Sequence, residues 1–117
     1  MKPYDVAREM ALENDCPFHL AALLWRRGKL IRIGINSRKK SPSFSRYYAD
    51  EDHANEAHAE MDALLVAKPG DYLEVMRWRK DGVLALAKPC KYCMLRIRRL
   101  EINARYTDSN GIWQLAV

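Results

Sequence analysis

Two short motifs that lie far apart in the chain constrain its fold more than any other feature. One is His58-Ala59-Glu60, and the other is the segment 89–93, which reads Pro-Cys-Lys-Tyr-Cys. Together they contain one imidazole, two thiols and one free carboxylate. An imidazole and two thiolates suit zinc, and three protein ligands leave the fourth tetrahedral position open for water, as in catalytic zinc sites. We therefore expect a fold that brings the two motifs together.

Each motif is expected at the start of a helix. Residues 57–67 have apolar side chains at helical spacing, which predicts a helix with His58 and Glu60 in its first turn. A second helix is expected over residues 90–100, where the two cysteines share one face and the positive helix N-terminus favours thiolates. The inward positions of the first helix are expected to be Ala57, Met61, Leu64 and Leu65.

Each motif alone also fits other kinds of site. A His-x-Glu triplet is often a surface histidine near a glutamate, and a Cys-x-x-Cys pair also occurs in structural zinc sites and in thioredoxin-like redox sites. A structural zinc site would need a fourth ligand, for which Cys16 and His19 are the candidates. A redox pair would not need a preceding helix with its own His58 and Glu60. Both motifs in this order favour a catalytic zinc site.

The order His-x-Glu followed by Pro-Cys-x-x-Cys resembles the cytidine and deoxycytidylate deaminase superfamily of zinc-dependent nucleobase deaminases. The resemblance implies that His58, Cys90 and Cys93 hold Zn²⁺ and that Glu60 is the catalytic acid and base. Zinc lowers the pKa of bound water to roughly 7, so hydroxide is available at neutral pH. A carboxylate beside the metal then moves protons from the water to the ring nitrogen and the leaving amine.

The resemblance also implies substrate-binding residues. The Asn36 side chain would bind a sugar hydroxyl, and the Ala59 backbone amide and the Lys88 backbone carbonyl would bind the edge of the base. The basic segment 38–40 suits a phosphate. Further candidates, which would fold over the base or ribose, are the loop aromatics Phe44, Tyr47 and Tyr48.

Turn signals and apolar periodicity divide the chain into helices and strands. Besides the two motif helices, we expect a helix over 3–14 whose inward residues are Val6, Met10 and either Leu12 or Ala11. We also expect a long polar loop over 36–55 and strands over 19–26, 30–35, 72–79, 103–107 and 112–117. The order matches the superfamily, which implies a three-layer α/β/α cytidine deaminase-like fold with a five-stranded mixed sheet flanked by helices. The last two strands should pair antiparallel, because the turn 108–111 is too short for a parallel crossover. That pairing is similar to the free-nucleoside cytidine deaminase branch and to some bacterial toxin deaminases, whereas a histidine at position 58 is similar to the deoxycytidylate and tRNA adenosine deaminases.

Composition sets broad limits. The chain has 117 residues, 49% of them hydrophobic and 30% charged, which suits one soluble domain over residues 1–117. No apolar run approaches the ~20 residues of a membrane span, and charged residues near the N-terminus interrupt any signal-peptide pattern. Two of the three cysteines belong to the metal motif, which fits a reducing compartment, and we expect a cytoplasmic protein. The net charge of +5 suits anionic ligands such as nucleotides and nucleic acids.

Three functions stand as hypotheses. The first is hydrolytic deamination of cytosine to uracil in a free nucleotide or nucleoside, with deoxycytidylate-like substrates favoured by His58 and the basic segment 38–40. The second is deamination of cytosine or adenine in single-stranded DNA or RNA, which the interleaved basic and aromatic residues of 38–48 would suit. The third is a non-catalytic zinc-stabilised binding module, in which Glu60 would have no purpose. The resemblance is also compatible with a homo-oligomer, because superfamily members often complete their pockets with neighbouring subunits.

Overall fold

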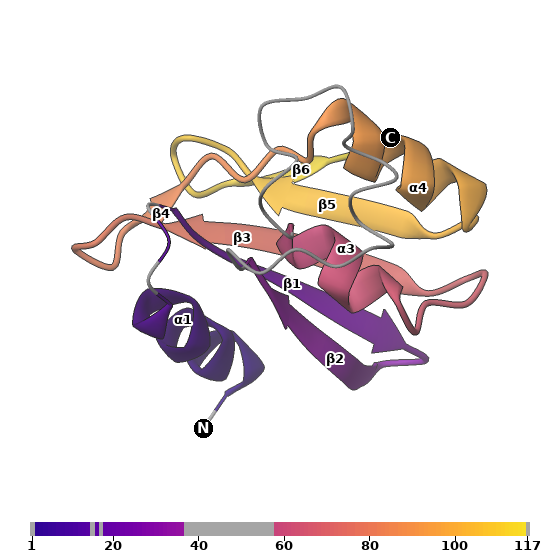
Figure 1. The fold of residues 1–117 in the computed structure, drawn as a ribbon, viewed down its shortest axis with the longest axis horizontal. Coiled ribbons are helices and arrows are strands. Elements are labelled where there is room, and N and C mark those ends of the chain that lie inside the picture. The colour runs from indigo at the N-terminus through magenta and orange to yellow at the C-terminus, as the bar shows by residue number, and fades with distance from the viewer. Residues whose placement is uncertain (1, 15, 17, 37–57, 117) are drawn as a thin grey trace.

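The computed structural model describes residues 2–14, 16, 18–36 and 58–116, which form a mixed sheet with helices on both faces (Figure 1). The helices expected at both motifs are present, and so are the strands expected around them. In chain order the elements are α1 (Pro3–Glu13), β1 (His19–Arg26), β2 (Lys29–Ile35), α3 (Ala59–Leu64), β3 (Tyr72–Trp78), β4 (Leu84–Ala85), α4 (Lys91–Arg99), β5 (Asn103–Thr107) and β6 (Trp113–Leu115).

The sheet has the order β2-β1-β3-β5-β6. Strand β1 pairs antiparallel with both β2 and β3, whereas β3 and β5 are parallel and are connected through α4. The predicted antiparallel pairing of the last two strands is confirmed, since β6 runs antiparallel to β5. The predicted count of five strands is wrong by one. The two-residue strand β4 pairs with the end of β3, because the turn at Gly82 folds the chain back onto Arg77 and Trp78.

The predicted three-layer arrangement is confirmed. Helix α1 packs on one face of β1, β2 and β3, while α3 and α4 contact each other on the opposite face. Strand β1 is apolar over most of its length because its side chains enter both layers in alternation: Ala21 and Leu23 belong to the core under α1, and Ala22 and Leu24 to the core under α3 and α4.

Two helices differ in detail from the sequence-based expectation. In α1 the buried residues are Ala7 and Ala11, whereas Met10, which was expected to face inward, is 39% exposed. Small residues at the interface let this helix lie close to the sheet. Helix α3 ends at Leu64, short of residue 67, so Leu65 lies beyond its last turn and is 58% exposed. Among the described residues, no helix is long and apolar enough to cross a membrane.

Helix α3 is fixed against β2 by a close backbone contact and by one carboxylate. A Cβ atom on Gly34 would overlap the Ala59 carbonyl and the Ala63 amide, so only glycine allows this approach. Asp62 accepts hydrogen bonds from the Arg32 guanidinium, at 2.6 Å, and from the Ile35 backbone amide, at 3.3 Å. These contacts set the position of the residues at the start of α3.

The segment that leads into α4 is attached to the end of β5. The Thr107 hydroxyl donates a hydrogen bond to the Ala85 carbonyl, at 2.8 Å, and the Ala87 amide donates to the Thr107 carbonyl, also at 2.8 Å. Ala87 and Pro89 are buried, while Lys88 between them is exposed. The second motif therefore starts from a fixed backbone.

Candidate metal centre and substrate pocket

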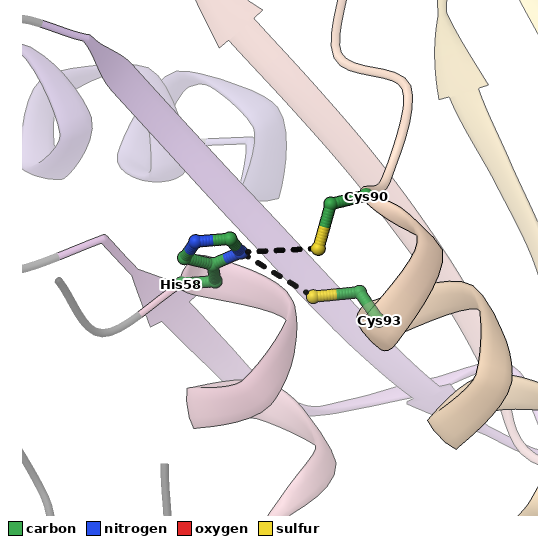
Figure 2. A group of neighbouring side chains, drawn as sticks. All are labelled: His58, Cys90 and Cys93. Atoms are coloured by element: carbon green, nitrogen blue, oxygen red, sulfur yellow. Dashed lines mark hydrogen bonds between the residues drawn. The ribbon is translucent and has the colours of Figure 1, made fainter. Parts of the chain in front are cut away.

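The two sequence motifs meet at the N-terminal ends of α3 and α4. His58 is the N-cap residue of α3, Cys90 is the N-cap residue of α4, and Cys93 lies in the first turn of α4. Figure 2 shows the two sulfur atoms pointing at one edge of the imidazole. The Nδ1 atom of His58 is 3.6 Å from the Cys90 Sγ and 3.5 Å from the Cys93 Sγ. The ligand atoms of all three residues lie within 4.8 Å of one another.

These distances suit a zinc ion. With Zn–S near 2.3 Å and Zn–N near 2.0–2.1 Å, tetrahedral ligands have nitrogen and sulfur about 3.6 Å apart. The donor set of two thiols and one imidazole is also the chemistry that zinc prefers. A hydrogen bond with Cys93 and the neighbouring His58 outweigh burial and lower the pKa of the Cys90 thiol to about 4. Cys90 is therefore poised to be the thiolate that a metal requires.

The two candidates for a fourth protein ligand lie elsewhere. Within the part of the chain that the structure describes, the cluster contains His58, Cys90 and Cys93 alone. His19 is buried, and its Nδ1 lies 2.9 Å from the Ala11 carbonyl oxygen. Cys16 is also buried, with its sulfur 4.0 Å from the Asn36 carbonyl oxygen. The arrangement is thus a three-ligand set, the kind that leaves one metal position for water.

Glu60 lies in the first turn of α3, two residues after His58, and is 4% exposed. Burial raises the pKa of its carboxyl group, and this effect is larger than the opposing influence of the nearby His58. No lysine or arginine among the described residues forms an ion pair with it. A buried carboxyl group with a raised pKa can hold and release a proton, as a general acid and base must.

A cavity of about 200 Å³ adjoins the cluster. The three residues that the superfamily resemblance implied for substrate binding, Asn36, Ala59 and Lys88, all border it. They come from the end of β2, the start of α3 and the segment before α4. The complete lining is Phe18, Leu20, Asn36, His58, Ala59, Glu60, Lys88 and Cys90. The fold therefore collects the candidate substrate contacts beside the candidate metal ligands.

Sequence reasoning did not identify Phe18 as a pocket residue. Its side chain is 49% exposed, and the Arg77 guanidinium carbon lies 4.6 Å from the ring centroid, within cation–π range. The position of Phe18 directly before the first strand of the predicted hairpin could have indicated that it borders the pocket. In an antiparallel hairpin the start of β1 lies beside the end of β2, so an aromatic residue just before His19 falls next to Asn36.

Several loop residues considered from the sequence lie outside the described residues. They are Arg38, Lys39 and Lys40, the aromatic residues Phe44, Tyr47 and Tyr48, and His53.

Comparison with solved structures gives the fold. Two crystal structures of the dCMP deaminase from the cyanophage S-TIM5 are similar: the complex with dCMP and dUMP has a TM-score of 0.56, and the apo form 0.55. The identity is 18% in both cases, and the alignments cover 91% of this chain and 82% and 86% of the respective deaminase chains. The chain has the dCMP deaminase fold. The resemblance to the cytidine and deoxycytidylate deaminases noted in the sequence is thereby confirmed at the level of fold. No protein-family model matches the sequence, and no curated protein does.

Proposed function

We propose that this chain is a single-domain zinc-dependent hydrolase of the cytidine and deoxycytidylate deaminase superfamily that converts cytosine to uracil in a free nucleotide or nucleoside. The observation that carries the proposal is the convergence of His58, Cys90 and Cys93 beside the buried Glu60, at the wall of a cavity. The shared fold of a dCMP deaminase supports it and favours a deoxycytidylate-like substrate. A zinc-stabilised binding module would give Glu60 no task.

The residues of the pocket suit the steps of hydrolytic deamination. When bound by His58, Cys90 and Cys93, zinc supplies the Lewis acidity that makes water nucleophilic at neutral pH. Glu60 accepts a proton from the attacking water and delivers protons to the ring nitrogen and to the departing amine. Water is consumed, the C–N bond of the amine breaks, and ammonia leaves.

The remaining pocket residues would orient the substrate. The Ala59 amide belongs to the first turn of α3, whose N–H groups have no partner within the helix. It would bind a carbonyl oxygen of the base, while the Lys88 carbonyl would accept a hydrogen bond from the exocyclic amine. Asn36 would contact the sugar. These three roles are the parts of the proposal that a substrate-bound structure would test directly.

A second candidate function is deamination of a base in single-stranded nucleic acid. A groove of about 560 Å³ adjoins the pocket at Lys88. Lys91 and Arg98 add two further cations to it, and Tyr92 adds an aromatic ring. The remaining lining is apolar, from Pro89, Met94 and Leu95. Cations for phosphates and an aromatic ring for stacking are the features that bind single strands.

One experiment tests both candidates. Purified protein should contain about one zinc per chain and release ammonia from deoxycytidylate or deoxycytidine. A Cys90→Ser variant should lose zinc and activity together, whereas Cys16→Ser, a matched change outside the ligand cluster, should retain both. Ammonia release from oligonucleotides alone, falling steeply with salt, would instead support the nucleic-acid candidate. A zinc-loaded protein that is inactive on cytosine in nucleotides and nucleosides, and on cytosine and adenine in oligonucleotides, would refute both candidates.

A further inference from the structure

We propose that Asn14, at the end of α1, is a positioning residue that fixes the Asn36 side chain as a hydrogen-bond donor to a sugar oxygen of the substrate. This inference rests on the proposed function, which supplies the nucleotide. It concerns a residue outside both motifs and outside the pocket lining. Asn14 is the C-cap residue of α1, and its side chain reaches Asn36 at the end of β2.

Backbone amides determine the orientation of both asparagine side chains. The Cys16 N–H donates to the Oδ1 atom of Asn14, at 3.1 Å, so the Nδ2 group of Asn14 must point the other way. That group donates to the Oδ1 atom of Asn36, at 2.8 Å. The Leu20 N–H donates to the same Asn36 oxygen, at 3.0 Å. Flipping either amide would place two donors against each other.

The His19 ring supports the same orientation. Its Nδ1 lies 2.9 Å from the Ala11 carbonyl oxygen and 3.2 Å from the Asn14 Oδ1 atom. Both neighbours are acceptors, so Nδ1 carries the proton, and the ring is held between the end of α1 and Asn14. Because His19 is buried, this contact is shielded from water.

The contacts of Asn36 determine what it can still offer. An asparagine side chain accepts two hydrogen bonds through its oxygen and donates two through its nitrogen. Both acceptor positions of Asn36 are used, by Asn14 and Leu20, and one N–H donates to the Phe18 carbonyl, at 2.9 Å. Among the described residues, the second N–H has no acceptor, and Asn36 borders the cavity beside the metal cluster. The group that Asn36 presents is therefore a donor, and its ligand must be an acceptor oxygen.

Asn14 matters because it occupies the oxygen of Asn36. In an Asn14→Asp variant, a carboxylate oxygen would face the Asn36 oxygen, and neither orientation of the Asn36 amide would satisfy Leu20, Phe18 and the introduced carboxylate together. In Asn14→Leu the donor is removed without a new charge. Either change should leave Asn36 poorly aligned toward a sugar oxygen, without altering the metal ligands or Glu60.

The test compares deoxycytidylate, which carries a 3′-hydroxyl group on its sugar, with 2′,3′-dideoxycytidylate, which lacks it. In the zinc-loaded full chain, Asn14→Asp and Asn14→Leu should each lower kcat/KM for deoxycytidylate about tenfold relative to the wild type. Most of this loss should come from a higher KM, as expected for loss of one aligned hydrogen bond. For the dideoxy substrate, both variants should match the wild type. Asn110→Asp, an exposed turn residue, is the matched control and should change neither value.

Equal losses on both substrates would show that Asn14 only supports the fold, and the proposal would be wrong. No loss on either would refute it as well. A binding measurement separates this inference from the proposed chemistry. In a Glu60→Gln background, calorimetry should show that Asn14→Leu weakens binding of deoxycytidylate and leaves that of the dideoxy compound unchanged. If Asn14→Leu weakens binding of deoxycytidylate selectively but the wild-type protein does not deaminate it, the proposed reaction is refuted and the role of Asn14 stands. If neither nucleotide binds, the role of Asn14 is refuted.

Discussion

Two buried glutamates lie on opposite faces of the sheet and have opposite surroundings. Glu74, on the α1 face, is 3% exposed, and Glu60, on the other face, is 4% exposed. The Glu74 carboxylate accepts hydrogen bonds from the Tyr4 hydroxyl, at 2.9 and 3.0 Å, and from the Arg105 guanidinium, with 2.7 Å to its Nε. Arg105 in turn lies over the Trp113 ring, 4.0 Å from its centroid. Glu60 has no such cation in the part of the chain that the structure describes.

The difference is that between a carboxylate with a structural role, Glu74, and one for which we propose a chemical role, Glu60. A buried carboxylate that is paired with a cation and accepts a hydrogen bond from a hydroxyl group has its charge compensated and its hydrogen bonds satisfied inside the protein. Such a carboxylate connects the elements that supply its partners. Glu74 joins α1, β3 and β5 in this way. A buried carboxyl group with a raised pKa and no cation keeps its capacity to exchange a proton. Burial of Glu60 therefore costs folding free energy, and in the proposed reaction this carboxyl group would exchange protons.

Glu60→Gln should give the largest functional effect. Because the amide cannot take a proton from water, deamination should fall by at least the ~10²–10⁴-fold typical of a lost general base. Zinc content and the circular dichroism spectrum should remain close to those of the wild type, and the melting temperature at neutral pH should not fall, because the variant removes a buried charge that costs folding free energy. A zinc-loaded Glu60→Gln protein with normal activity would break the comparison, because Glu60 would then not be the proton carrier.

Glu74→Gln should have its effect on stability. It leaves Arg105 without its counter-charge in a mostly buried site, for which a cost of about 3–5 kcal/mol is typical. Urea unfolding at neutral pH should show this loss, while the folded fraction should retain zinc and turnover per zinc. Glu101→Gln, a matched change at an exposed position, should alter neither. An unchanged unfolding midpoint for Glu74→Gln would contradict the structural role.

Gly34→Ala should disturb the face of the sheet on which the candidate metal ligands His58, Cys90 and Cys93 lie. The new methyl group would push the start of α3 away from β2, at a cost of about 1–3 kcal/mol for overpacking. His58 and Glu60 would move with the helix, so zinc affinity and turnover should both fall. Ile33→Val, on the opposite face of the same strand, is the control and should leave zinc affinity unchanged. Loss of stability with unaltered zinc affinity would show that α3 tolerates the shift.

Asp71→Asn extends the comparison to a third buried carboxylate. Hydrogen bonds from Arg26, at 2.8 and 2.9 Å, are the main reason that the pKa of Asp71 lies below its usual value of 3.8. The variant should lose about 1–2 kcal/mol of unfolding free energy, because the introduced amide oxygen can still accept a hydrogen bond from Arg26 and only the charge is removed. A lowered folded-state pKa stabilises the protein above pH 3.8, and this contribution disappears as the pH falls through the lowered value.

Denaturation curves from about pH 7 to about pH 2 for the wild type and Asp71→Asn would measure this contribution. The difference in unfolding free energy should be constant above about pH 5 and should shrink below about pH 4. A difference that stays the same over the whole range would mean that the Arg26 contact does not depend on the charge of Asp71.

The sequence by itself determined the elements and the reactive groups. Helical spacing located α3 and α4, alternation and turns located the strands, and the short turn at 108–111 required the antiparallel end of the sheet. Motif chemistry predicted His58, Cys90 and Cys93 as metal ligands beside Glu60, and the structure brings these residues together. These features are local, so a linear pattern contains enough information to predict them.

Only the tertiary structure decided which residues surround those groups. It showed that Met10 and Leu65 face outward, that β4 adds a sixth strand, and that Phe18 borders the pocket. It also brought Asn14 to Asn36 across the start of the sheet. Such contacts depend on the distance between a helix and a sheet and on the register of paired strands. Those quantities are set by packing between distant segments, and no local pattern in the chain encodes them.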